Sequence, residues 1–326
     1  MVKDEVLRIL EENRGSLISG GALSKTLDVS RTAVWKAVSA LKEEGFEIDI
    51  LKSSGYRLTP ECDKPSEAGI GRYLKTDALG REMSVFHSIP STNLHLRKLA
   101  EGGSGHGCTV IADLQTKGRG RMSRSFFSPP EGIYMSILFR PQNTGIIPQL
   151  ITIAAAVSVA EAVDSVCGVS TSIKWVNDIF IDGKKVCGIL TEGSVEAESG
   201  AYFYLISGIG INVHKPKDGY PEELKDIAAA VDETAVKAFT KNQLIAEVLN
   251  RFEEVYLSLS EEASISALIE RYRRKLFILN KKITVKSASG SYPAVALDIN
   301  DKGNLLVKKE DGTEALLSSG EISIRI

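Results

Sequence analysis

The sequence has few of the residues that mark disulfide-linked or zinc-binding proteins. Its 326 residues contain four cysteines and four histidines. The histidines form no H-E-x-x-H motif, and the cysteines are far apart without any C-x-x-C pair; they are Cys62, Cys108, Cys167 and Cys187. This spacing predicts neither a disulfide framework nor a zinc site. We therefore expect reduced thiols, a cytoplasmic protein and no metal held by the protein's own ligands.

The sequence also lacks a strong net charge and a long apolar run. With 40 basic and 42 acidic residues its formal net charge is −2, which argues against binding nucleic acid through bulk charge. The longest apolar run, LITIAAAVSVAEAV at 150–163, contains Glu161 and is too short to span a membrane. It predicts a buried helix. The start, MVKDEVLRILEEN, is amphipathic and carries acids, so it does not read as a signal peptide.

The first sixty residues predict three helices followed by a hairpin, the order of a winged helix-turn-helix. The helices are expected at 2–13, 20–27 and 31–45, and the hairpin at 46–59. Ser30 is the expected N-cap of the third helix. In that helix Val34, Val38 and Leu41 recur at helical spacing, which predicts a buried stripe.

The face opposite that stripe predicts contact with DNA. From 30 to 42 it carries no acidic residue, and the third helix of such a domain enters the major groove. The expected DNA-contacting residues are Ser30, Arg31, Thr32, Trp35 and Lys36 on the helix, with Lys52 and Arg57 on the wing. The alternative is that these are solvated surface charges and that Trp35 packs against the wing. Residues 1–57 contain nine basic and nine acidic residues, so one domain should bind weakly and a dimer should bind better.

The remainder predicts a mixed or antiparallel α+β sheet and a small C-terminal β domain. Strands are expected at 83–89, 108–114, 132–140 and 202–214, with two more joined at Asp182-Gly183 within 170–193. Helices are expected at 91–103, 150–163, 241–259 and 265–277. Short alternating segments after 282 predict an SH3-like barrel. We expect domains at 1–62, 63–277 and 278–326.

The stretch QTKGRGRMSRSFF at 115–127 places three arginines among glycines with no acid. Guanidinium groups match phosphate and carboxylate oxygens, so the stretch predicts an anion-binding loop. A dinucleotide fingerprint fails because Ser123 stands where a glycine is needed and no helix follows. An RNA-binding tail is disfavoured because the stretch lies between two expected strands. A loop that closes over nucleotide phosphates fits best.

Several motifs together resemble the bifunctional biotin protein ligases that also repress transcription. They span the chain and are STN at 91–93, QTKGRGRMSR at 115–124, KWVND at 174–178, GKKVCGIL at 183–190, GIGIN at 208–212 and GEISIR at 320–325. In the common loop of that family a glycine stands at the place of Ser123, and tryptophan is frequent at the place of Phe126. Neither difference removes an arginine.

The resemblance implies a fold and a reaction. The fold is a winged helix-turn-helix, a class II synthetase-like mixed-sheet domain and an SH3-like domain. The reaction uses ATP and Mg²⁺ to form biotinyl-5′-AMP, and then transfers biotin to a lysine of a biotin carboxyl carrier protein. The implied partners are that carrier, operator DNA and a second copy of the chain when adenylate is bound. Two alternatives stay open: a lipoate-type ligase, and a biotin-sensing transcription factor without ligase activity.

The resemblance also assigns residues. Catalytic roles fall to Lys185, Arg119, Arg121 and Asp178. The biotin-binding set is Ser91, Thr92, Asn93, Gln115, Gly118, Arg119, Gly120, Arg121 and Lys185. The nucleotide-binding set is Arg121, Arg124, Lys174, Asn177, Asp178 and Asn212. The C-terminal domain is expected to complete the ligase through Glu321 and Arg325, or else to act as a structural cap.

Overall fold

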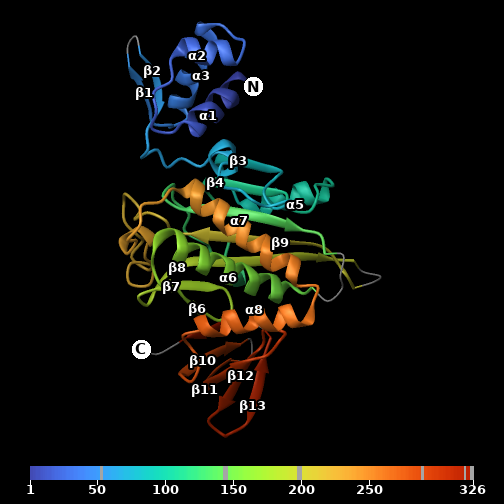
Figure 1. Cartoon of the computed structure of the whole chain (residues 1–326). Coiled ribbons are helices and arrows are strands. Elements are labelled where there is room, and N and C mark those ends of the chain that lie inside the picture. Colours follow the sequence, from blue (N-terminus) through green and yellow to red (C-terminus); the bar gives the residue numbers. More distant parts are fainter. Residues whose placement is uncertain (52–53, 142–145, 197–199, 288–289, 319–320, 324–326) are drawn as a thin grey trace. The chain divides into compact units, whose positions relative to one another are not determined.

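The computed structural model describes residues 1–51, 54–141, 146–196, 200–287, 290–318 and 321–323. The chain divides into two compact units (Figure 1). The first contains Met1–Lys75 and Phe239–Glu247, and the second contains Thr76–Ala238 and Val248–Ile326. Helix α7 (Lys241–Ser258) contributes residues to both units. The expected boundaries at 62 and 277 stay predictions.

The first unit has the element order expected of a winged helix-turn-helix. Its elements are α1 (Val2–Glu12), α2 (Gly20–Thr26), α3 (Arg31–Glu43), β1 (Ile48–Leu51), β2 (Gly55–Leu58) and α4 (Glu67–Gly71). Val34, Val38 and Leu41 of α3 are fully buried in its core, which confirms the helical stripe. The Ser30 hydroxyl accepts a hydrogen bond from the Ala33 amide at 3.1 Å and caps α3 as expected.

Buried polar contacts explain why the start of α7 belongs to this first unit. The Asn242 side chain accepts a hydrogen bond from the Ser66 amide at 3.0 Å, at the N-cap of α4. Glu11 on α1 is 1% exposed and pairs with Arg14 at 2.7 Å. A buried carboxylate needs such a partner, because leaving it unpaired costs several kcal/mol. The Ser66 hydroxyl also donates to the Glu11 carboxylate at 3.5 Å, so these contacts join α1, α4 and the first turn of α7.

The second unit is built on a seven-stranded mixed sheet, as the sequence predicts. Its order is β3-β4-β5-β9-β8-β7-β6; β3 pairs with β4 in parallel and every other pairing is antiparallel. The strands are β3 (Met83–Ile89), β4 (Thr109–Gln115), β5 (Ile133–Phe139), β6 (Ser172–Lys174), β7 (Asp178–Ile181), β8 (Lys184–Val195) and β9 (Tyr202–Ile211).

The prediction of two strands at 170–193 is wrong, because that segment forms three. Lys174 pairs with Asp178, so β6 and β7 make a tight hairpin of their own before the expected turn. The Asp182-Gly183 turn then joins β7 to β8, and both turn residues have positive φ, 48° and 80°. The Trp175–Val176 peptide between β6 and β7 is cis.

Helices cover both faces of the sheet. The alternating side chains of β9 show which of its residues lie on the face covered by α5. Tyr204 and Ile206 share a buried cluster with Leu96 and Ala100 of α5 (Thr92–Glu101). Side chains alternate along a strand, so Gly208 and Gly210 continue that face. Helix α6 (Pro148–Cys167) packs against β8 and β9 as well, through contacts distinct from that cluster.

Helix α6 is the buried helix expected around 150–163. It is long and apolar enough to cross a membrane by composition, with mean hydropathy 1.8, but 78% of that window is buried inside the protein. It packs against the sheet and against α8 (Glu262–Lys275) as a core helix (Figure 1). This apolar run therefore forms part of the hydrophobic core of the second unit.

A five-stranded antiparallel sheet follows α8, in the order β13-β12-β11-β10-β14. Its strands are β10 (Lys282–Ser287), β11 (Gly290–Ile299), β12 (Leu305–Lys309), β13 (Glu314–Leu317) and β14 (Glu321–Ser323). The alternating segments after 282 are thus confirmed as strands. Arg273 on α8 holds this sheet, pairing with Asp298 at 2.7 Å and donating to the Ile299 carbonyl at 2.9 Å.

Candidate functional site

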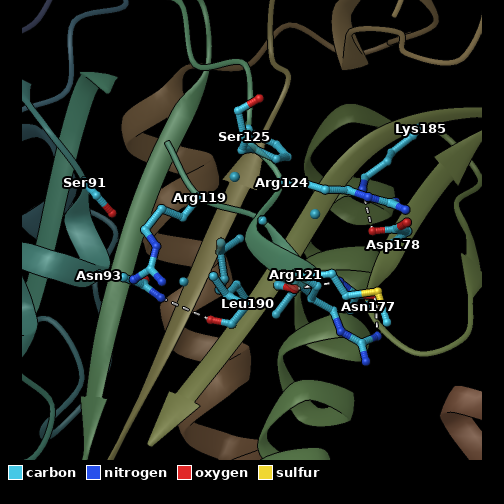
Figure 2. Close-up of a pocket in the computed structure, with 18 of the residues that line it drawn as sticks. Ser91, Asn93, Arg119, Arg121, Arg124, Ser125, Asn177, Asp178, Lys185 and Leu190 are labelled. Carbon is cyan, nitrogen blue, oxygen red and sulfur yellow. Dashed lines mark hydrogen bonds and ion pairs between the residues drawn. The ribbon is translucent and has the colours of Figure 1, made fainter. Parts of the chain in front are cut away.

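A pocket lies over the sheet where three glycines leave the face without side chains. Gly188 on β8 is directly opposite Gly210 on β9, and Gly208 lies two residues away on the same face. A Cβ atom at Gly208 would overlap the Asn93 side chain, so glycine is required for that close approach. The space above these glycines is about 990 Å³, counting the part open to solvent. Figure 2 shows the side chains around it.

One end of the pocket is a buried, hydrogen-bonded polar rim at the start of α5. Gln115 accepts hydrogen bonds from the Thr92 amide at 2.8 Å and from the Thr92 hydroxyl at 3.1 Å. The Ser136 hydroxyl lies within hydrogen-bond distance of the Thr92 hydroxyl at 2.7 Å and of Asn93 Oδ1 at 2.6 Å. Ser91 is 2% exposed and makes no capping hydrogen bond to α5. This end offers fixed donors and acceptors to a small polar ligand group.

The arginine loop folds as a small hairpin at the edge of this pocket. Arg119 and Ser125 form a β-bridge, and the Gly120 amide donates to the Arg124 carbonyl at 2.7 Å. Residues Arg121–Ser123 make a short 3₁₀ turn, in which Met122 has a φ of 53° and is 64% exposed. Because the hairpin fixes the backbone, the Arg119, Arg121 and Arg124 side chains all line the pocket.

Phe126 pins the end of the loop to the floor of the pocket. Its ring lies against Gly188 and Gly210, where added Cβ atoms would come within 2.9 and 2.5 Å of ring carbons. The ring also meets Tyr134 edge-on, with centroids 6.4 Å apart. Larger residues at 188 or 210 would push the ring away. The glycines and Phe126 therefore form one packing unit that sets the height of the loop.

The other end of the pocket carries charged residues to which the resemblance assigns catalytic roles. Lys185 Nζ lies 2.5 Å from the Asp178 carboxylate, and Arg121 donates to Asn177 Oδ1 at 3.4 Å. Figure 2 shows Lys185 and Asp178 across the pocket from Ser91 and Asn93. Among the described lining residues there are five cationic side chains and one carboxylate, so the pocket favours an anionic ligand; the cations are Arg119, Arg121, Arg124, Lys174 and Lys185.

Glu192 was not predicted, yet it holds one arginine of the loop. Its carboxylate lies 3.2 Å from Arg119 and 3.1 Å from Arg97 of α5, and it accepts from Asn93 at 2.9 Å. Part of the Arg119 charge is thus already compensated. Arg119 therefore lines the pocket and also connects the loop to β8 through its ion pair with Glu192.

The structure brings most of the expected ligand-binding residues into this one pocket, with two exceptions. Asn212 donates to the Lys185 and Ala229 carbonyls at 3.5 and 3.2 Å and does not line the pocket. Gly118 supports the loop from behind, where a Cβ would crowd Ser128. For Glu321 only the backbone is described, and Arg325 and Lys52 lie outside the described residues.

The structure also shows how the expected DNA-contacting residues lie in the first unit. Ser30, Arg31, Thr32 and Lys36 are exposed, and Trp35 is 54% exposed rather than buried against the wing. On the wing, Arg57 pairs with Asp49 across the hairpin at 2.5 Å, so its charge is partly compensated. The exposed face of α3 remains the expected contact surface.

The four cysteines are buried and free. Burial raises the pKa of the Cys108 thiol to about 11 and that of Cys167 to about 12. Burial also raises the pKa of Cys62 and that of Cys187, which is beside the pocket on β8. Thiols with raised pKa stay protonated and react slowly, so these four act as small apolar core residues.

Comparisons with known proteins agree with this geometry. The model of the Biotin/lipoate A/B protein ligase family matches residues 85–212. An HTH domain model matches 3–57, and the Biotin protein ligase C terminal domain matches 278–325.

Curated relatives from several bacteria carry the name "Bifunctional ligase/repressor BirA". The protein of Bacillus spizizenii is 36% identical over 98% of this chain and 97% of its own length. That of Escherichia coli is 26% identical over 95% of this chain and 94% of its own. A solved biotin protein ligase from Aquifex aeolicus, in complex with biotin and ATP, is 30% identical, with a TM-score of 0.63 over 75% of this chain and 99% of its own.

Proposed function

The chain belongs to the biotin/lipoate A/B protein ligase family, among its bifunctional ligase/repressors, and from this we propose how its pocket works. The chain is an ATP-dependent biotin protein ligase with an N-terminal DNA-binding repressor domain. One observation supports the residue assignment best. A single pocket joins a fixed polar rim at Ser91–Asn93 to a cationic end at Lys185 and Arg121.

In the first step an oxygen of the biotin carboxylate attacks the α-phosphorus of ATP. The bond from that phosphorus to the bridging oxygen breaks, and pyrophosphate leaves with the electron pair. Two anions must approach one another, so fixed positive charge lowers the barrier. Lys185 and Arg119 hold the carboxylate end in this proposal, while Arg121, Arg124 and Lys174 face the phosphates. Biotin itself occupies the rim of Ser91, Thr92, Asn93 and Gln115.

In the second step a neutral lysine amine of the carrier protein attacks the acyl carbon of biotinyl-5′-AMP. The acyl–oxygen bond breaks, AMP leaves, and the amine loses a proton. Asp178 is the carboxylate in the pocket and lies 2.5 Å from Lys185. In this proposal the pair accepts that proton, with Asp178 as its first acceptor. The curated name of a Mycobacterium tuberculosis relative, biotin–[acetyl-CoA-carboxylase] ligase, supports a carboxylase carrier as acceptor.

Mg²⁺ fits this site as a partner of the substrate's phosphates. No three His, Cys, Asp or Glu side chains cluster among the described residues. Magnesium keeps several waters and binds through one or two carboxylates together with phosphate oxygens. Asp178 would supply the protein's oxygen, and the ion would neutralise phosphate charge.

The pocket is built so that the arginine loop shields the intermediate. Phe126 and Arg119 tie both ends of the hairpin to β8 and β9. Excluding water slows hydrolysis of the mixed anhydride and strengthens every charge contact.

We place the protein in the cytoplasm, consistent with four buried free thiols. We also propose a homodimer when adenylate is bound, because the first domain's balanced charge calls for two DNA contacts.

An exchange assay tests the ligase assignment against its two alternatives. Purified protein, Mg-ATP and labelled pyrophosphate should give label in ATP when biotin is present. Exchange with lipoate and none with biotin would favour a lipoate-type ligase. Biotin binding without exchange would favour a sensor that does not ligate.

Operator binding tests the switch. Affinity should rise when biotin and ATP are both present, because the adenylate favours the dimer. Equal operator affinity with and without the two ligands would reject ligand-linked repression while leaving the ligase assignment intact.

A further inference from the structure

The turn between β11 and β12 of the C-terminal sheet lies against the segment that carries the catalytic carboxylate. The turn is residues 300–303, sequence NDKG, and hydrogen bonds within the turn fix its backbone. Asn300 Oδ1 accepts from the Lys302 and Asn304 amides at 3.1 and 2.9 Å, and Gly303 donates to the Asn300 carbonyl at 2.8 Å. Gly303 has a φ of 78°, which suits glycine. The turn thus presents the Gly303 carbonyl in a fixed direction.

Two side chains of the catalytic domain donate to that one carbonyl. The Trp175 indole Nε1 lies 2.9 Å away, and Gln149 Nε2 of α6 lies 2.5 Å away. Trp175 is 3% exposed, so its indole N–H has no water to replace this acceptor. A Cβ on Gly303 would overlap Ile153 of α6. The contact is therefore close, buried and specific to glycine.

Trp175 is three residues before Asp178, and each residue between is held. Val176 is 7% exposed, and its carbonyl accepts from the buried Tyr272 hydroxyl of α8 at 2.9 Å. Asn177 donates to the Ile189 carbonyl at 2.7 Å, and the Ile189 amide donates to the Asn177 carbonyl at 3.0 Å. Asp178 then reaches Lys185. The Trp175 indole is thus one of the contacts that fix the backbone from 175 to 178, which ends at the ion pair.

We propose that the 300–303 turn of the C-terminal sheet positions Asp178 and Lys185 by anchoring Trp175. The C-terminal sheet then contributes to adenylation through a backbone carbonyl, rather than only through the side chains near its end. Gly303 is a positioning residue, since its effect on the reaction passes through Trp175, which also lines the pocket. This proposal rests on the ligase function of the pocket.

Two substitutions and a matched control test it in the full-length protein. Trp175→Phe removes the indole N–H while keeping a ring. Gly303→Ala pushes the turn away from Ile153. Gly312→Ala is the control, because Gly312 lies in the next turn of the same sheet at φ 83°, yet nothing lies within 4 Å of an added Cβ. Both glycine variants carry similar φ strain, so only the contact differs.

The readouts separate positioning from loss of fold. The rate of biotin-dependent pyrophosphate exchange gives kcat and KM for adenylation, and calorimetric titration with biotin counts folded sites. We expect kcat per folded site to fall at least fivefold in Trp175→Phe and tenfold in Gly303→Ala, with the KM for biotin within twofold. Gly312→Ala should keep the wild-type kcat.

Outcomes that overturn the proposal differ from those that overturn the function. If the two test variants match Gly312→Ala in kcat per folded site, the turn is a structural cap and the proposal fails. A drop confined to the number of folded sites also contradicts it. If Gly303→Ala does not fold, Trp175→Phe decides, because a fall in its kcat at an unchanged KM for biotin separates positioning from a change in the pocket lining. If wild-type protein makes no biotinyl-5′-AMP, the ligase function fails instead.

Discussion

The contact of Phe126 with Gly210 gives the sharpest prediction about the arginine loop. An alanine at 210 would place its Cβ 2.5 Å from one ring carbon and 2.8 Å from another. Overpacking of this kind costs about 1–3 kcal/mol. The ring can escape only by lifting off the floor, which raises the loop. We therefore expect Gly210→Ala to speed release of biotinyl-5′-AMP by about 5- to 140-fold, since 1.4 kcal/mol is tenfold.

Phe126→Ala should act on the same contact from the other side. The ring is partly buried, so losing it removes about 1–2 kcal/mol of the 1.5–3 kcal/mol available from burying a whole phenylalanine. Release should then accelerate about 5- to 30-fold. The structure also predicts how the double variant Phe126→Ala/Gly210→Ala should behave. With alanine at 126 there is no ring to clash with, so the cost of Gly210→Ala should largely vanish.

The assay is the rate at which labelled adenylate leaves the protein after dilution into excess unlabelled biotin and ATP. A double-mutant cycle of the four proteins gives the coupling energy, which we expect to be at least about 1 kcal/mol in the sense that the second change costs less. Additive effects would mean that ring and glycine do not touch in the loaded protein. The packing account of the loop would then be wrong.

Three further predictions concern other parts of the chain. Arg121→Ala removes a cation assigned to the adenylate. We expect it to release biotinyl-5′-AMP at least tenfold faster, since hydrogen bonds to charged groups contribute about 1.5–3 kcal/mol. The control Lys117→Ala removes an exposed charge outside the pocket and should change the release rate less than twofold. Burial would raise the pKa of Glu161, but Arg271, Arg251 and Lys275 outweigh burial and hold it below its ordinary 4.5. Its contribution to stability is present above pH 4.5 and lost as pH falls through the lowered pKa, so Glu161→Gln should flatten that part of the unfolding free-energy profile. Trp35→Ala should weaken operator binding about tenfold without lowering the melting temperature, because more than half of the indole is exposed; an unchanged operator affinity would remove Trp35 from the DNA interface.

Local sequence patterns predicted most of the elements because each pattern depends on near neighbours. Helical spacing marked the buried stripe of α3, and the Asp182-Gly183 pair marked the β7–β8 turn. The β6–β7 hairpin was missed, because its turn at Trp175–Asn177 contains neither glycine nor proline and looks like continuous strand. The residues of the pocket were found for a different reason. Their motifs occur together in one protein family, so the combination identifies them although the sequence does not show their positions in space.

Contacts between distant segments could not be predicted from the sequence. Phe126 gives no sign that it packs on Gly188 and Gly210, although glycines inside a strand do signal a close approach. Glu192 is one of many acids, and only the fold brings it beside Arg119. Asn212 shows the opposite case, because a polar residue after a strand was assigned to the nucleotide but satisfies two backbone carbonyls. Each difference follows from tertiary contacts that spacing does not encode.

The central property proposed for this protein is that its pocket and arginine loop hold biotinyl-5′-AMP away from water. The direct measurement is the lifetime of that anhydride when bound to a molar excess of protein, followed by chromatography and compared with the lifetime of the free compound in the same buffer. We expect the bound anhydride to survive at least tenfold longer, and Gly210→Ala to shorten that survival. Equal lifetimes in the bound and free states would contradict the account.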